Sequence, residues 1–455
     1  MTLTRRHFLQ TSGAFTLGLA GLHGLVGCSD MRYAARFGPL VPDPEGIFDL
    51  PRGFTYRVIS RAGERMTDGF YVPAAHDGMA AFPGQDGRTI LVRNHEMDLG
   101  RDPAHGPFGS ANELFARLSL EDLYDAGHNG QPCLGGTTTL VYDTMTQELV
   151  SHYLSLAGTL RNCAGGPTPW NSWITCEETV DLPGEHCARA HGYPFEVPVT
   201  ATPGLARPVP LTAMGRFNHE AVAVCPNSGV VYQTEDQSDG LLYRFLPDTP
   251  GMLANGGRLQ ALAVAGQSAL DTRNWGPEPA VAVGAVLATR WIDLDEVEAP
   301  ENDLRYRGFD LGAARFARGE GMWYGNDAVY FACTNGGEAE RGQIWRYVPS
   351  PNEGAPQESE APGTLELFVE PNDPGLVDNA DNLTVTPWGD LILCEDGSGE
   401  QFLVGIKPDG TAYKFARNAV SNSELAGATF SPDGTTLFVN IQHDGLTLAI
   451  TGPWG

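Results

Sequence analysis

Residues 86–96 read DGRTILVRNHE, which is an Asp-Gly turn, a run of strand-forming residues and a polar cluster of Asn94, His95 and Glu96. Such a run after a turn predicts a short buried β-strand. The pattern recurs as PWNSWITCEE at 169–178, PNSGVVYQTED at 226–236, GNDAVYFACTN at 325–335, PWGDLILCED at 387–396 and SPDGTTLFVN at 431–440. Copies start about 45 to 100 residues apart, a period that suits propeller blades with inserted loops.

A β-propeller also closes its ring and hides its strand edges. A large β-sandwich or a β-helix is the alternative, and the regular rhythm of turn, strand and polar cluster favours the propeller. Helical periodicity is weak outside 111–125, 292–298 and 309–316. Gly (56) and Pro (33) make up about a fifth of the 455 residues, while 42% are hydrophobic, so the chain has many turns and a real core. We therefore predict an all-β fold, a single β-propeller over 51–455 with a few short helical insertions.

The net charge is −27. An acidic surface repels the phosphate backbone, so nucleic acid is not an expected partner. It would also repel small phosphate esters, unless bound cations reverse the sign locally. Composition leaves two interpretations open, a solubilising surface or carboxylates that hold metal ions.

The N-terminus resembles an export signal. A twin-arginine pattern, Arg5-Arg6, precedes an apolar run at 14–20 that is too short to span a membrane. Leu25-Val26-Gly27-Cys28 looks like a lipobox, although a chance small-residue tract ending in Cys would look the same. We expect a signal peptide over 1–27, export by the twin-arginine machinery, and a tether over 28–50 lipidated at Cys28. The protein would then be anchored at the periplasmic face of the envelope, and Ser29 favours the outer membrane.

Eight cysteines are present, and lipidation of Cys28 would leave seven, an odd number. Cys225, Cys333 and Cys394 each end an apolar run, so we expect them to be small buried hydrophobic residues. Cys176 and Cys187 could form a local disulfide.

The polar clusters carry the chemistry. Each follows an equivalent strand, so a propeller would bring them together around its axis. Crowded carboxylates repel one another unless cations or protons offset the charge, and oxygen-rich clusters suit calcium or harder transition ions. Solvated loop residues are the other interpretation. The clustered residues are Asn94, His95, Glu96, Glu177, Glu178, Glu235, Asp236, Asn335, Glu395, Asp396 and Asn440.

Two further stretches add unusual atoms. Cys163 lies in a small-residue turn, Asn-Cys-Ala-Gly-Gly, where a thiolate could ligate a transition metal. In Arg318-Gly-Glu320, the arginine could clamp a phosphate through two hydrogen bonds while Glu320 holds metal. A structural salt bridge is the alternative for this pair.

Several motifs occur in a characteristic order. They are Asn94-His95-Glu96, Gly135-Gly136-Thr137-Thr138, Asn162-Cys163-Ala164-Gly165-Gly166, Thr175-Cys176-Glu177-Glu178, Arg216-Phe217-Asn218-His219-Glu220, Arg318-Gly319-Glu320-Gly321 and Asp381-Asn382-Leu383. Together they resemble the PhoX family of alkaline phosphatases over most of residues 45–450. The resemblance implies six blades and an active site with an Fe³⁺ pair and several Ca²⁺ ions. It implies Cys163, Glu220 and Glu320 as iron ligands, Glu178, Glu96, Asp236 and Glu395 as calcium ligands, and Arg318 as the group that holds the substrate phosphate.

The expected function is metal-dependent hydrolysis of small phosphate monoesters. The chain lacks a Gly-x-Ser-x-Gly motif, in agreement with a metal-held oxygen nucleophile. Two alternatives keep the propeller. One is a calcium-dependent lactonase or phosphotriesterase, which has no use for Cys163 or Arg318, and the other is a non-enzymatic cell-envelope scaffold.

Overall fold

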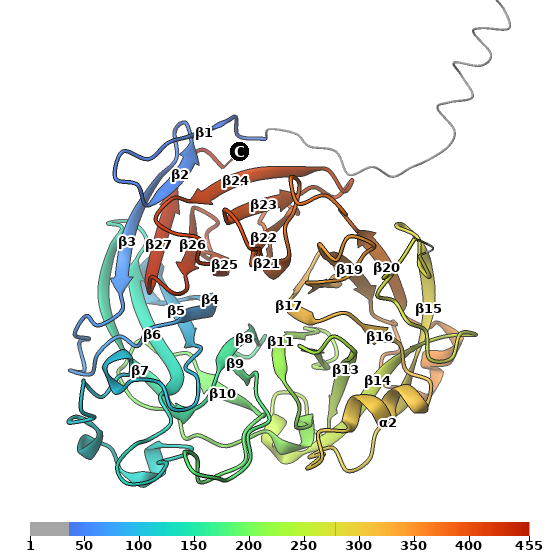
Figure 1. Ribbon diagram of the computed structural model, residues 1–455, viewed down its shortest axis with the longest axis horizontal. Helices are drawn as coiled ribbons and strands as arrows, with labels where there is room; N and C mark the ends of the chain where they lie inside the picture. The colour runs from blue at the N-terminus through green and yellow to red at the C-terminus, as the bar shows by residue number, and fades with distance from the viewer. Residues whose placement is uncertain (1–35, 278, 455) are drawn as a thin grey trace, which may run out of the picture. The chain divides into compact units, whose positions relative to one another are not determined.

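The computed structural model describes residues 36–277 and 279–454. Nearly every element in this part is an antiparallel strand, and the sheets surround a central axis (Figure 1). The described α-helix is α2 (Leu304–Asp310), which lies on the outside of the ring.

Four sheets are separate blades. Their members, from the axis outward, are β4 (His76–Pro83), β5 (Arg88–His95), β6 (Gly135–Asp143) and β7 (Glu148–Thr159); β8 (Asn162–Pro167), β9 (Ser172–Glu177) and β10 (Pro194–Pro198); β21 (Ala380–Val385), β22 (Leu391–Glu395), β23 (Phe402–Ile406) and β24 (Ala412–Asn418), extended by β2 (Phe48–Pro51) and β1 (Leu40–Val41); and β25 (Leu425–Phe430), β26 (Thr436–Ile441), β27 (Leu446–Thr451) and β3 (Thr55–Arg61).

The fifth sheet contains two such meanders joined edge to edge. One runs through β11 (His219–Val224), β12 (Val231–Glu235), β13 (Gly240–Pro247) and β14 (Gly257–Val264), and the other through β17 (Gly319–Gly325), β18 (Ala328–Cys333), β19 (Gln343–Val348) and β20 (Thr364–Val369). β15 (Val286–Asp293) pairs with β14 and β20 and so connects them. The short β16 (Arg315–Phe316) pairs with β13.

The predicted β-propeller is confirmed. Each of the six sequence repeats forms the second strand of one meander, namely β5, β9, β12, β18, β22 or β26. The innermost strands are β4, β8, β11, β17, β21 and β25, and each contacts the next around a closed ring. The residues that end the repeats therefore meet at one end of the axis.

The ring closes by joining the two ends of the described chain. β3 pairs with β27 from Thr55↔Thr451 to Arg61↔Leu446. β2 pairs with β24 in the preceding blade, so residues 40–51 belong to the propeller rather than to the tether predicted over 28–50. Strand exchange of this kind leaves no free edge at the point of closure.

Small residues allow the innermost strands to approach closely. A Cβ on Gly78 would lie 2.6 Å from Cα of Ala164, and a Cβ on Gly321 would lie 2.6 Å from Cα of Asn382. Side chains larger than hydrogen are thus excluded here by backbone atoms of the next blade. The axis is packed below the strand ends, and only a space of about 20 Å³ remains there.

The predicted helices are wrong. Residues 111–125 contain only two short 3₁₀ turns, Phe115–Arg117 and Leu120–Asp122. β15 occupies the start of 292–298, and β16 occupies the end of 309–316. Apolar residues there pack across sheets, so their spacing does not report a helical face. α2 itself was not predicted.

The cysteines follow the sequence in part. Cys225, Cys333 and Cys394 are buried among apolar residues, as expected. Cys176 and Cys187 are both free thiols, so the suggested local disulfide is absent from the described residues.

Within the described ranges, no helix is long and apolar enough to cross a membrane. The twin-arginine pattern and Cys28 lie outside the described residues.

Candidate active site

Each blade presents three equivalent positions near the axis. We call the second residue of the innermost strand the strand position, the residue two places before it the lead position, and the residue after the second strand the end position. In every blade the lead carbonyl accepts a hydrogen bond of 2.9–3.2 Å from the end-position N–H. The register of the two strands then shifts near the strand position, as between His76 and Met79 in the first blade. Such β-bulges re-aim side chains.

These positions build a polar cavity of about 150 Å³. The strand positions contribute Asp77, Cys163, Glu220, Glu320 and Asp381; the end positions contribute Glu96, Glu178, Asp236, Asp396 and Gln442; and the lead positions contribute Arg161, Arg318 and Glu424. Every lining residue therefore comes from the repeat, and nine of the thirteen are carboxylates.

Burial and mutual repulsion disfavour the charged carboxylates. Desolvation, together with neighbouring acids, raises the pKa of Asp77, Glu178, Glu220, Glu320 and Glu424 well above the usual range. The same causes raise the pKa of Asp381 to about 6. Without cations the cavity therefore holds protons that would normally be lost at neutral pH.

Arg318 is held at the rim by two acids. Its Nε and Nη2 donate to the two oxygens of Asp236 at 2.8 and 2.9 Å, and Nη2 also donates to Glu320 at 2.6 Å. No described group accepts a hydrogen bond from Nη1, and the side chain is 34% exposed. The guanidinium is thus fixed in place with one donor group left for a ligand.

Arg161 occupies the same lead position in another blade. It donates to Glu96 at 3.0 Å and to Glu178 at 2.7 Å, and Gln442 binds Glu96 from the opposite side at 2.6 Å. Both arginines have left-handed backbone angles, with φ of 41° and 50°. This strained conformation is paid for by the surrounding repeat.

Cys163 is 4% exposed, and its thiol faces the carbonyl of His219 at 3.5 Å. Desolvation and nearby acids raise the pKa of the thiol well above its ordinary value. A thiolate here needs a strong positive partner, such as a metal ion.

The cavity contains Arg318, Cys163, Glu220, Glu320, Glu178, Glu96 and Asp236, all of which the sequence suggested. Asp236 is committed to Arg318 rather than free to bind calcium. Glu395 does not line the cavity. Its carboxylate accepts the N–H groups of Asp378 and Phe402, so the suggested calcium ligand anchors backbone instead. Strand alternation turns Glu395 away and its neighbour Asp396 inward.

Sequence reasoning did not assign Asp77, Asp381, Glu424, Arg161 or Gln442. Their common signal is the three-position repeat, which relates residues 16 to 21 places apart and is visible only once the strands are paired.

Three groups of lining atoms lie close enough to share an ion. They are Cys163, Glu178 and Glu220; Glu220, Glu320 and Asp381; and Asp77, Glu96 and Glu424, each with ligand atoms within 4.8 Å of one another. Two groups share Glu220, and the third offers only oxygen. Buried acids that outnumber the two lining arginines fit bound cations well.

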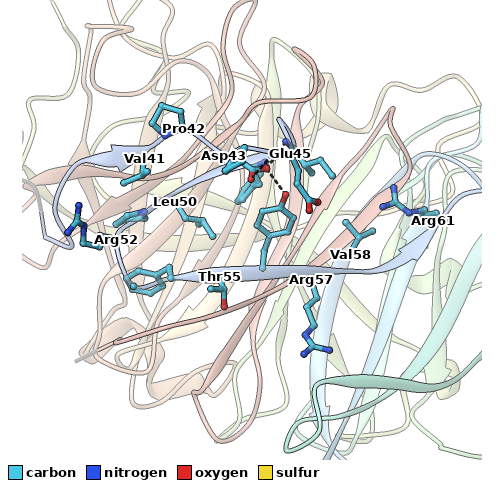
Figure 2. Close-up of a pocket in the computed structure, with 17 residues that line it drawn as sticks. Val41, Pro42, Asp43, Glu45, Leu50, Arg52, Thr55, Arg57, Val58 and Arg61 are labelled. Carbon is cyan, nitrogen blue, oxygen red and sulfur yellow. Dashed lines mark hydrogen bonds between the residues drawn. The ribbon is translucent and has the colours of Figure 1, made fainter.

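The largest cavity lies elsewhere. It has about 850 Å³ and is formed at the rim by β1, β2 and β3 (Figure 2). Its most buried acid, Asp43, accepts hydrogen bonds from Tyr56 and from the N–H groups of Ile47 and Phe48, so it closes a turn. This cavity has no comparable cluster of ligand atoms.

Comparisons with known proteins agree with this fold. Pseudomonas fluorescens PhoX, solved in complex with vanadate, a transition state analogue, superposes with a TM-score of 0.64 at 17% identity, covering 93% of this chain and 98% of that one. A gluconolactonase from Xanthomonas campestris has a TM-score of 0.40 at 13% identity, covering 92% and 99%. No curated protein sequence matches.

The family comparison covers nearly all of the propeller. The sequence profile of Alkaline phosphatase PhoX matches residues 35–141 and 128–445, far more than half of the chain. The chain therefore belongs to the PhoX family of alkaline phosphatases and is an enzyme of the phosphatase class.

Proposed function

We propose that this cavity hydrolyses small phosphate monoesters with the help of bound iron and calcium. The observation that carries the proposal is the balance of charge, nine carboxylates and a thiol facing two arginines in a cavity of about 150 Å³. Trapped cations offset this repulsion and, together with Arg318, attract a phosphate dianion to a protein of net charge −27.

The ligand atoms divide by chemistry. Cys163 with Glu178 and Glu220, and Glu220 with Glu320 and Asp381, would hold an iron pair joined through Glu220. Asp77, Glu96 and Glu424 offer only oxygen, which suits calcium. Bound metals would act as Lewis acids toward the phosphoryl group.

Arg318 would bind the substrate. Asp236 and Glu320 orient its planar guanidinium, and Nη1 points to a phosphoryl oxygen as charge builds there. A fixed donor of this kind lowers the barrier more than a flexible one. The vanadate complex of P. fluorescens PhoX is that of a transition state analogue, which suits such a site.

The test combines metal analysis with hydrolysis of p-nitrophenyl phosphate. We expect iron and calcium in the purified protein. Arg318→Ala and Arg318→Lys should keep the metals and lose about 10²–10³-fold in kcat. Asp236→Asn should keep the metals and lose less, because it only releases the arginine. Glu320→Gln should lose iron together with activity.

The matched control is Arg258→Ala, which removes an exposed ion pair with Asp293 on β15 and should leave kcat unchanged. Full activity of Arg318→Ala would overturn the assigned role. Calcium without iron would favour a different hydrolase, and absence of both metals from active protein would refute the proposal.

We also propose that the protein is exported through the twin-arginine machinery and anchored through lipidated Cys28 on the periplasmic face of the outer membrane. The motifs at Arg5-Arg6 and 25–28 support this. Several acyl chains would be required, because one gives only marginal binding. Cys28→Ser should abolish processing and release the protein from membranes on fractionation. Unchanged pelleting of the variant would contradict the anchor.

A further inference from the structure

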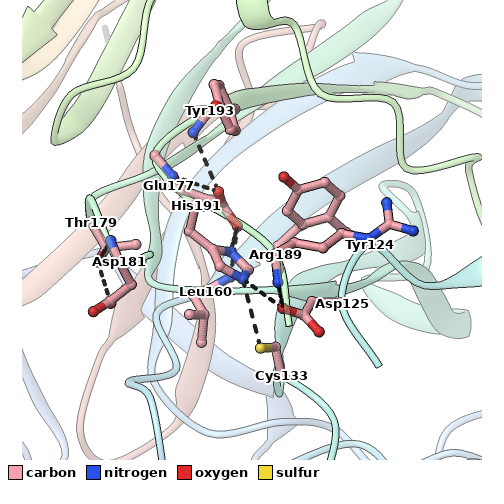
Figure 3. Close-up of polar contacts among 12 residues, drawn as sticks. Tyr124, Asp125, Cys133, Leu160, Glu177, Thr179, Asp181, Arg189, His191 and Tyr193 are labelled. Atoms are coloured by element: carbon pink, nitrogen blue, oxygen red, sulfur yellow. Dashed lines mark hydrogen bonds and ion pairs between the residues drawn. The ribbon is translucent and has the colours of Figure 1, made fainter. Parts of the chain in front are cut away.

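A second cluster of metal-ligating atoms lies outside the central cavity. Asp125 and Cys133 come from the long connection between β5 and β6, and Cys187 and His191 come from the connection between β9 and β10 (Figure 3). All four side chains are buried. The proposed phosphatase chemistry uses none of them.

The distances fit tetrahedral coordination. His191 Nε2 lies 3.3 Å from Asp125 Oδ2 and 3.8 Å from Cys133 Sγ. Ligand atoms of Asp125, Cys187 and His191 lie within 4.8 Å of one another. Around a tetrahedral zinc ion, with bonds of about 2.0–2.3 Å, neighbouring ligand atoms are about 3.3–3.7 Å apart. Only small shifts would complete the geometry.

The surrounding residues already orient the ligands. His191 Nδ1 lies 2.6 Å from Glu177, a carboxylate that leaves Nε2 facing the sulfur atoms (Figure 3). Asp125 accepts the N–H groups of Ala188 and Arg189 at 2.7 and 2.8 Å. A carboxylate behind a metal-bound histidine is the usual arrangement in zinc sites, because it fixes the ring and its tautomer.

An ion could also reach this cluster. Cys133 lies in the wall of a separate open cavity of about 300 Å³, which His128 and His186 also line. Thiolate and imidazole ligands favour zinc over calcium.

We propose that Cys133, Cys187, His191 and Asp125 form a structural zinc site that joins the two connections. Those connections begin at Glu96 and Glu178, two acids of the central cavity. The zinc would thus hold one wall of the active site in place without touching the substrate. Four protein ligands leave no open position, as is usual for structural zinc.

Two metal-free arrangements compete with this site. In one, His191 is protonated between two acids; although burial lowers it, Glu177 and Asp125 raise the pKa of His191 to about 12. In the other, Cys133 and Cys187 form a disulfide in an oxidising compartment. Each predicts a different result.

The test uses the full-length protein, incubated with zinc and then desalted. Elemental analysis should find one zinc per chain. Cys187→Ala and His191→Gln should lose it, while Cys163→Ala, the matched control in the central cavity, should keep it. Cobalt in place of zinc should give the visible absorption of a tetrahedral thiolate site in the wild type and in Cys163→Ala, but not in Cys187→Ala.

If the variants fail to fold, zinc-edge X-ray absorption of the wild type decides the question. Two sulfur ligands at about 2.3 Å, with nitrogen or oxygen at about 2.0 Å, support the site. No retained zinc, or zinc that depends on Cys163 instead, overturns it. A Cys133–Cys187 disulfide, found by alkylating denatured protein without reductant and mapping its peptides, also overturns it. None of these results depends on phosphatase activity.

Discussion

At the scale of single residues, the site depends on groups that cannot be stable alone. Cys163 is buried among acids that raise the pKa of its thiol, and Arg318 is oriented by Asp236 and Glu320. The pair of Arg318 and Asp236 is not a surface ion pair of little value, because it positions a donor at the mouth of the cavity.

Replacing Cys163 tests whether it binds iron. Thiolate bonded to Fe³⁺ should colour the protein by charge transfer, so Cys163→Ala should bleach the visible band and lower iron content while leaving calcium in place. The control is Cys225→Ala, which removes a buried thiol far along β11 from the cavity and should leave the spectrum intact. A coloured Cys163→Ala protein would contradict the assignment.

At the scale of strands, one irregularity is repeated around the ring. A bulge near the start of each innermost strand places a strand-position side chain at the cavity, and the lead carbonyl fixes the end position beside it. The same close approach of strands requires glycine at 78 and 321. Site and axis packing therefore come from one local geometry.

Adding a methyl group at the axis should be costly. In Gly321→Ala the new Cβ would lie 2.6 Å from Cα of Asn382 and from O of Asp381, both backbone atoms of the next blade. Overpacking of this kind costs about 1–3 kcal/mol of unfolding free energy, measurable by guanidinium denaturation. Gly204→Ala, at an exposed position with no atom within 4 Å, is the control and should change little. Equal midpoints for both variants would show that the strands can separate freely.

At the scale of the whole molecule, charge and ring closure act together. All blades direct acids to one end of the axis, and β3 with β27 prevents the ring from opening to relieve the repulsion. The metal-free protein must therefore keep protons in its cavity or lose stability.

Stability of the metal-free protein should fall as pH rises. The carboxyl pKa values are raised in the folded state, to about 6 for Asp381 and well above the usual range for Glu220 and Glu320, whereas unfolded carboxyls titrate near about 4. The folded state then binds more protons between these values, and each such proton costs about 1.4 kcal/mol per pH unit.

We expect chelator-treated protein to unfold at higher guanidinium concentration at about pH 5 than at about pH 8. Restored metals should remove this difference, because cations then stabilise the ionised acids. The double variant Glu220→Gln, Asp381→Asn should weaken the pH dependence in the metal-free state. Greater stability at about pH 8 without metal would show that the acids are not desolvated as the structure indicates.

The sequence alone determined the repeated strand and its polar end, because turn residues and β-branched runs act locally. It thereby located the second strand of every blade and placed Glu96, Glu178 and Asp236 at one end of the axis. The order of the motifs supplied the family resemblance and, with it, the roles suggested for Cys163, Glu220, Glu320 and Arg318.

Only the tertiary structure decided which acid of each adjacent pair faces the cavity. Glu177 and Glu395 have the same composition and spacing as metal ligands, yet they accept backbone N–H groups, while Glu178 and Asp396 face the axis. The strand-position acids Asp77 and Asp381, and the pairing of Cys187 with His191 and Asp125, likewise depend on contacts between separate segments. A local pattern cannot report them, because strand register and blade order set those distances.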